Sequence, residues 1–81
     1  MFTILHKNVG GRTFDRYYQS WETAKKELLN ELAGLKGIGC TVTQHYDYFN
    51  AEKGIYIFEY RGKTPRGEGF SLSLLDGHFS D

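Results

Sequence analysis

The chain has 81 residues, of which 40% are hydrophobic and 16% aromatic, with a single proline. This composition excludes a disordered segment, and the length allows one hydrophobic core and therefore one domain, residues 1–81. Lys and Arg together number 10, as do Asp and Glu, so the formal net charge is zero. A neutral chain lacks the overall basic charge of many nucleic-acid-binding proteins, although a local basic patch is still compatible with it.

The single cysteine and the N-terminal residues bear on the compartment. Cys40 has no partner for a disulfide within the chain, which favours a reducing environment. The first residues, MFTILHKNV, lack the cationic start and long apolar core of a signal peptide. No apolar run approaches the roughly 20 residues that span a bilayer. We therefore expect a cytoplasmic protein that does not associate with membranes.

Two strands joined by a tight turn are predicted at the N-terminus, over residues 2–9 (FTILHKNV) and 12–18 (RTFDRYY). Gly10 and Gly11 between them suit the positive φ angles of a type I′ turn, which places His6 opposite Asp15. One face holds Leu5, Val9 and Phe14, and the other holds Phe2, Ile4 and Tyr17. The hairpin is expected to be partly buried on both sides, and which face packs inward stays open.

The one convincing helix is predicted over residues 20–37, SWETAKKELLNELAGLKG. Its apolar residues recur at steps of three and four and form one stripe: Trp21, Ala24, Leu28, Leu32 and Leu35, with Leu29 at the edge. Ser20 is the expected N-cap. Gly37 is the expected left-handed residue after the helix, and Ile38 is expected to make the apolar contact that follows it.

Three further strands are predicted after the helix, over residues 40–49 (CTVTQHYDYF), 55–61 (IYIFEYR) and 70–75 (FSLSLL). Residues 50–54 form a turn with Gly54 left-handed, and residues 62–69 (GKTPRGEG) form a loop. Pairing the first two strands by parity gives one face with Val42, Tyr46, Tyr48, Tyr56, Phe58 and Tyr60. The opposite face then holds Thr43, His45, Asp47, Ile55, Ile57, Glu59 and Arg61. In the last strand, Phe70, Leu72 and Leu74 point inward.

These elements predict an α+β fold of ββαβββ order, with a curved, five-stranded antiparallel sheet packed on one helix. Five strands about 4.8 Å apart make a sheet roughly 20 Å wide, whereas a helix is about 10 Å across. Either the sheet curls strongly around the helix, or part of its aromatic surface contacts another molecule. This mismatch points to binding.

Two groups of residues suggest binding surfaces, and each has a simpler structural explanation. The aromatic face of the two middle strands could stack on nucleic-acid bases, but it is also the natural core beneath the helix. The loop region carries Arg61, Lys63 and Arg66 beside glycines, with Glu68 opposing them. Such a loop can contact phosphates or acidic partners, or can be a solvated hairpin loop.

Catalytic and metal chemistry has little support in the sequence. His45-x-Asp47, and Asp76, His78 and Asp81 in the tail, are ligand types without an established metal motif, so we expect neither a metal nor a cofactor. Residues five apart on a strand point to opposite faces, which argues against a dyad of Cys40 and His45. An enzyme would need a deep pocket enclosing His45, Asp47 and Cys40. We expect no catalytic residues.

The sequence therefore favours a small non-catalytic protein-binding or regulatory module, homodimeric through sheet surface or a strand edge, or binding another protein. Its candidate binding residues are His45, Glu59, Arg61, Lys63 and Arg66, with His45 expected as a cross-strand partner of Glu59. The alternative is a nucleic-acid-binding domain that uses Arg61, Lys63 and Arg66 with Lys7, Arg12 and Arg16 of the first hairpin. A small enzyme is the third class.

Overall fold

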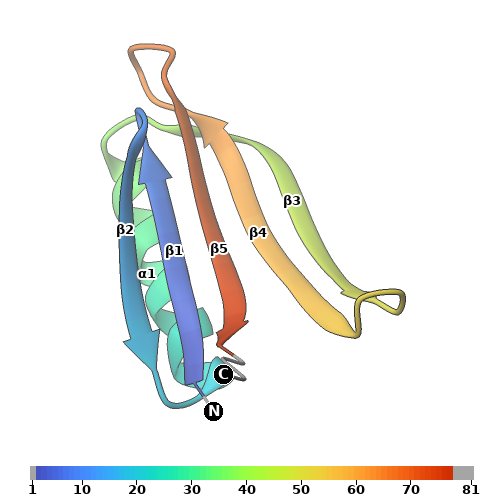
Figure 1. The fold of residues 1–81 in the computed structure, drawn as a ribbon. Helices are drawn as coiled ribbons and strands as arrows, with labels where there is room; N and C mark the ends of the chain where they lie inside the picture. The colour runs from blue at the N-terminus through green and yellow to red at the C-terminus, as the bar shows by residue number, and fades with distance from the viewer. Residues whose placement is uncertain (1, 78–81) are drawn as a thin grey trace.

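A computed structural model describes residues 2–77 of the chain as one helix against a five-stranded sheet (Figure 1). The elements are β1 (Phe2–Val9), β2 (Arg12–Tyr18), α1 (Trp21–Gly37), β3 (Thr41–Asn50), β4 (Ile55–Lys63) and β5 (Gly69–Gly77). All neighbouring strands are antiparallel, in the order β2-β1-β5-β4-β3, and the sheet does not close. The predicted α+β fold and its ββαβββ order are confirmed.

Helix α1 begins as predicted and ends differently. The Ser20 hydroxyl accepts a hydrogen bond from the Thr23 amide at 3.2 Å, and Ala24, Leu28, Leu32 and Leu35 are buried. The prediction for Gly37 was wrong: this residue is still helical, and Gly39 takes the positive φ of 97°. The expected apolar contact of Ile38 was also wrong, because Ile38 caps the helix with 68% of its surface exposed.

The first hairpin follows the prediction. Gly10 and Gly11 have φ angles of 58° and 85°, and His6 lies opposite Asp15 with 2.5 Å between Nδ1 and Oδ1. Leu5 is buried against the helix, whereas Ile4 on the other face is half-buried. β1 is therefore partly buried on both sides, and the face with Leu5 is the inner one.

Strand β5 lies at the centre of the sheet and supplies much of the core. Phe70, Leu72 and Leu74 are all buried, as predicted. Leu74 pairs with Leu5 of β1 on one side and with Phe58 of β4 on the other. Each such fully buried side chain stabilises the fold by about 1.5–3 kcal/mol through its removal from water.

The predicted register of the second hairpin was wrong by one residue. Asn50 pairs with Ile55, so the turn has four residues, and His45 lies opposite Tyr60 instead of beside Glu59. Paired residues of an antiparallel ladder share a face, so the predicted segregation is scrambled. The inner face, toward α1, holds Val42, His45, Asp47, Phe49, Tyr56, Phe58 and Tyr60. The outer face holds Gln44, Tyr46, Tyr48, Ile57, Glu59 and Arg61.

A bulge and a buried glycine account for further differences in this hairpin. The register shifts between Val42 and Gln44, so Thr43 is an extra residue, and Val42 and His45 share the inner face. β4 continues through Gly62, which was predicted to lie in the loop but is buried and pairs with Phe70. The remaining loop comprises residues 64–68.

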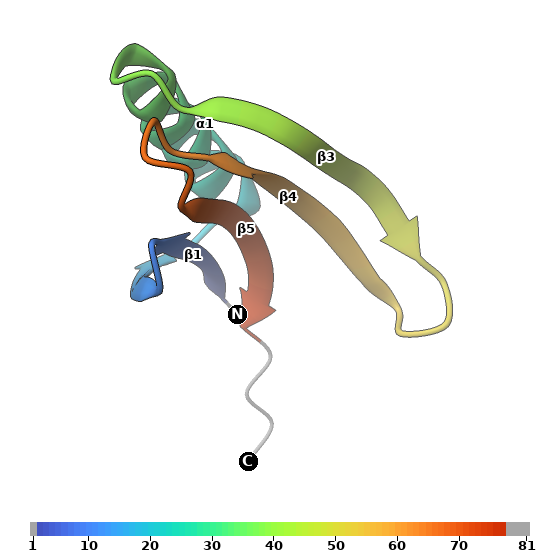
Figure 2. The same ribbon diagram turned by 90° about the horizontal axis from the view of Figure 1, so that it is seen from above.

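Helix α1 covers only part of the sheet. It packs against β1, β2 and β5, and the outer part of the β3–β4 hairpin projects beyond it (Figure 2). The molecule is 39 Å long in its largest dimension. The sheet therefore does not wrap around the helix, and the mismatch in width that the sequence indicated is present in the fold.

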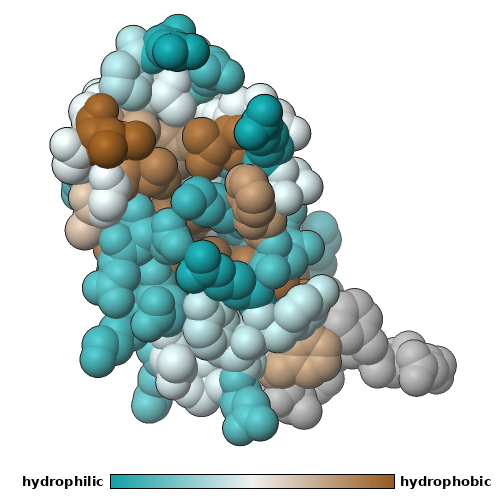
Figure 3. All heavy atoms as spheres, turned by 90° about the vertical axis from the view of Figure 1, so that its left-hand side faces the viewer, coloured by the Kyte–Doolittle hydropathy of each residue, from teal (hydrophilic) through white to brown (hydrophobic). Residues whose placement is uncertain are grey.

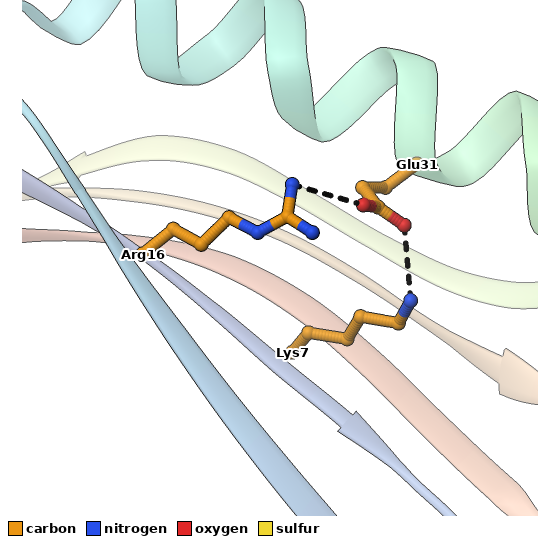
Figure 4. Close-up of polar contacts among 3 residues, drawn as sticks. All are labelled: Lys7, Arg16 and Glu31. Atoms are coloured by element: carbon orange, nitrogen blue, oxygen red, sulfur yellow. Dashed lines mark hydrogen bonds and ion pairs between the residues drawn. The ribbon is translucent and has the colours of Figure 1, made fainter.

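An ion-pair cluster joins α1 to the first hairpin. Seen from the β2 side, apolar and hydrophilic side chains are interspersed over the surface (Figure 3). Here Glu31 of α1 reaches between two cations, with 2.9 Å from Lys7 Nζ to Oε2 and 3.5 Å from Arg16 Nη1 to Oε1 (Figure 4). The pKa of Arg16 is raised, first by a side-chain hydrogen bond with Tyr18 and then by the Glu31 carboxylate.

Within the described residues, no helix has the length and apolar character needed to cross a membrane.

Candidate functional site

The most distinctive surface of the molecule is the end of the β3–β4 hairpin, residues 48–57, which we call the arm. The pairing of β4 with β5 ends at Phe58 and Leu74, whereas β3 and β4 continue to pair up to Asn50 and Ile55. The arm is therefore a two-stranded ribbon that extends past the rest of the sheet (Figures 1 and 2). Gly54 closes its turn with a φ of 65°, and Asn50 Oδ1 accepts a hydrogen bond from the Lys53 amide.

Aromatic side chains lie exposed on both faces of the arm. Tyr48 on the outer face is 48% exposed, while Phe49 and Tyr56 on the inner face are 61% and 38% exposed. An aromatic contact joins the arm to α1: the rings of Trp21 and Tyr56 meet edge to face with their centroids 5.4 Å apart. Two-stranded ribbons are marginally stable alone, so this contact helps to hold the arm in place.

The inner face next to the arm carries a second aromatic group. The His45 imidazole stacks on the Tyr60 ring with centroids 4.0 Å apart and planes 7° apart, and both rings contact Phe58 edge to face. Lys25 of α1 places its ammonium group 5.0 Å from the Phe58 centroid. His45 is itself exposed, so one of its sides faces solvent. The adjacent Asp47 accepts a hydrogen bond from the Tyr56 hydroxyl.

The outer face brings two of the candidate residues together. Glu59 and Arg61 form an ion pair of 3.0 Å between Oε2 and Nε, and the Arg61 guanidinium lies 5.9 Å from the centroid of the Tyr46 ring. This group is on the opposite face of the sheet from His45. The prediction that His45, Glu59 and Arg61 share one face was wrong, because His45 pairs with Tyr60 and not with Glu59.

The basic residues do not gather into one patch. Arg61 and Lys63 line a shallow cleft of about 610 Å³ on the outer face together with Glu68, while Arg66 is exposed in the loop of residues 64–68. In the first hairpin, Lys7 and Arg16 are on the inner side, where both pair with Glu31. Arg12 shares their face and is exposed.

A pocket expected for an enzyme would have to enclose Cys40, His45 and Asp47. Cys40 is buried, and neither Cys40, His45 nor Asp47 lines the outer cleft. A second pocket, of about 300 Å³, lies beside the Glu31 cluster and is bordered by Leu5 and Phe14. Within the described part of the chain, no three His, Cys, Asp or Glu side chains are placed to hold a metal ion. His78 and Asp81 lie outside the described residues.

Phe49 was not singled out from the sequence, although a signal for it is present. Residues 51–54 (AEKG) make a four-residue turn, which pairs Asn50 with Ile55 and therefore Phe49 with Tyr56. The predicted five-residue turn reversed this parity. The exposure of both rings depends on how much of the hairpin α1 covers, which no local pattern reveals.

Comparisons of the chain with protein-family models, with curated proteins and with solved structures found no match.

Proposed function

We propose that the chain is a small, non-catalytic protein-binding module and that the arm is its principal binding element. The observation that carries this proposal is the projection of residues 48–57 beyond α1 with Tyr48, Phe49 and Tyr56 exposed. Tyr and Phe are enriched in protein interfaces, where their rings bury a large area and few rotatable bonds are restricted.

Polar and charged groups beside the arm would set specificity. His45 and Asp47 lie next to it on the inner face, and the Glu59–Arg61 pair lies next to it on the outer face. Because the formal net charge is zero, overall electrostatic repulsion opposes association only weakly. Binding through the arm is therefore expected to depend on aromatic burial and to change little with salt.

The test is site-specific photo-crosslinking in the cells that naturally make the protein. A photoreactive phenylalanine analogue replaces Tyr48 or Phe49 in the arm, and Phe14 in the matched control, because Phe14 is 54% exposed on the distant strand β2. We expect protein adducts from positions 48 and 49 and none from position 14. Adducts from position 14 alone, or from none of the three, would overturn the proposal.

The alternative remains a nucleic-acid-binding domain, for which the neighbouring Arg61 and Lys63 in the outer cleft are the supporting observation. Such binding would decrease steeply as salt is raised, because phosphate contacts release counterions. Light scattering behind size-exclusion chromatography, with and without mixed oligonucleotides, separates the two. Co-elution with oligonucleotides at low salt, lost on reversing the charge of Arg61 or Arg66, would favour the alternative.

A further inference from the structure

The outer edge of β3 is a long strand edge, and beyond the bulge at Thr43 its one acidic side chain is Asp47. β3 has 10 residues and lies at the end of the sheet, so one side of its backbone has no neighbouring strand within the described residues. It contains no Lys, Arg or Pro, the residues by which exposed edges commonly avoid pairing. The opposite edge, β2, carries two arginines, Arg12 and Arg16, and is protected in this way.

Symmetry limits how two copies of β3 could pair. When two antiparallel strands are related by a two-fold axis, residues that face each other lie on the same face of the sheet. The axis must therefore lie next to one residue, which faces the same residue of the other copy. The bulge at Thr43 leaves residues 44–50 as the regular part of the edge. The central choices are therefore Tyr46, Asp47 and Tyr48.

Charge selects among these three centres. An axis at Asp47 places two carboxylates directly opposite each other, which is unfavourable. An axis at Tyr48 leaves each Asp47 opposite a phenylalanine, Phe49 of the other copy. An axis at Tyr46 instead places His45 of each copy opposite Asp47 of the other, and places the two Tyr46 side chains opposite each other.

We propose that two copies of this chain associate through the β3 edges, antiparallel, about an axis at Tyr46, so that His45 of each copy faces Asp47 of the other. This inference rests on the proposed function and specifies its partner as a second copy. A neutral imidazole donates a hydrogen bond to a carboxylate and a protonated one adds charge, so the pair is favourable in both forms.

The side chains that would form the contact are already held in place. His45 is stacked on Tyr60, and Asp47 is held by the Tyr56 hydroxyl, so both are positioned by β4 on the same inner face. On the outer face the Arg61 guanidinium lies over Tyr46. Groups fixed before association lose less conformational entropy when the interface forms.

The resulting dimer would have one continuous sheet of both chains. The two helices would cover its outer parts, and the uncovered β3–β4 hairpins would form its centre. Each arm would extend along the partner beyond the axis. The uncovered half of each sheet would thus be adjacent to the same half of the other copy, and each β3 edge would be covered.

Cysteine crosslinking tests the register directly. In a Cys40→Ala background, Tyr46→Cys should form a disulfide-linked dimer on mild oxidation, because facing Cα atoms about 4.5–5.5 Å apart are within disulfide range. His45→Cys and Asp47→Cys should each crosslink weakly alone and efficiently when the two are mixed. Thr13→Cys, exposed on the other edge, is the matched control and should remain monomeric under these conditions.

The unaltered chain provides the second measurement, as a dilution series in sedimentation equilibrium. We expect a monomer–dimer equilibrium whose Kd rises about tenfold in His45→Asp, which opposes two pairs of carboxylates, and is unchanged in Thr13→Asp. Each variant adds one negative charge, so net charge is matched. An unchanged Kd in His45→Asp would overturn the inference.

The remaining outcomes distinguish this inference from the proposed function. Crosslinking mainly through position 45 or position 47 alone would overturn the register. A monomer at every concentration, with no crosslink at position 46, would overturn the second copy as partner. If photo-crosslinks from the arm then identify a different protein, the protein-binding function stands while the homodimer does not.

Discussion

The rings of Trp21 and Tyr56 meet edge to face with centroids 5.4 Å apart and planes at 83°, and this contact joins the first turn of α1 to the arm. Trp21 also packs against the buried core, whereas Tyr56 is 38% exposed. The contact therefore links the stable part of the domain to its projecting part. We expect the orientation of the arm relative to the helix to depend on it.

We expect a measurable coupling between these two rings. In a double-mutant cycle with Trp21→Ala and Tyr56→Ala, the interaction energy should be about 0.5–1.5 kcal/mol, as for other aromatic pairs. Urea denaturation of the four proteins measures it. A coupling close to zero would show that the arm keeps its position without the helix.

Stability should divide sharply along the second hairpin. Phe58 is 2% exposed, so Phe58→Ala should destabilise the fold by roughly 3–5 kcal/mol. Phe49→Ser lies on the same inner face but on the arm, where the ring is 61% exposed, and should cost less than about 1 kcal/mol. Chemical denaturation compares the two. A loss above about 2 kcal/mol in Phe49→Ser would mean that the arm packs against the domain in solution.

The local patterns of the sequence were sufficient for most of the architecture. The glycines at positions 10 and 11 determined both the turn and the register of the first hairpin, because few other residues adopt two successive positive φ angles. The apolar spacing of α1 identified its buried stripe from Ala24 to Leu35. Strand β5 alternated clearly enough to give its inward residues.

The second hairpin was less predictable because small differences in length reverse its faces. A turn of four residues instead of five moved His45 away from Glu59, and the bulge at Thr43 changed the parity again near the start of β3. The exposed arm is a tertiary property, since it arises where the helix stops covering the sheet. No spacing of residues in β3 or β4 encodes that position.

The Glu31 cluster gives a prediction about two ion pairs that share one carboxylate. Lys7 is 26% exposed and Arg16 62% exposed, so solvent screens the second pair more strongly. We expect a coupling of about 1 kcal/mol between Lys7 and Glu31, and a weaker coupling between Arg16 and Glu31. Double-mutant cycles with Lys7→Met, Arg16→Met and Glu31→Gln measure both couplings.

Salt provides the control for this comparison. The Arg16 coupling should vanish near 1 M salt, where the Debye length is about 3 Å, and the Lys7 coupling should persist in part. If both couplings decreased equally with salt, solvent would screen the two pairs equally, contrary to the exposures of 26% for Lys7 and 62% for Arg16.

Gly62 gives the most direct test of how β3, β4 and β5 fit together. A Cβ atom on this residue would overlap the Thr41 carbonyl oxygen and lie 2.5 Å from Cε2 of Phe70, which is buried. Gly62→Ala should therefore destabilise the fold by about 1–3 kcal/mol, because a backbone atom and a core ring must both move.

Gly69→Ala is the matched control: a Cβ there meets no atom within 4 Å, so its effect should stay within about 1 kcal/mol. Thermal and urea unfolding of the two variants measure the difference. Equal stabilities would mean that β3 does not pass close to Gly62, and the pairing of Val42 with Gly62 would have to be revised.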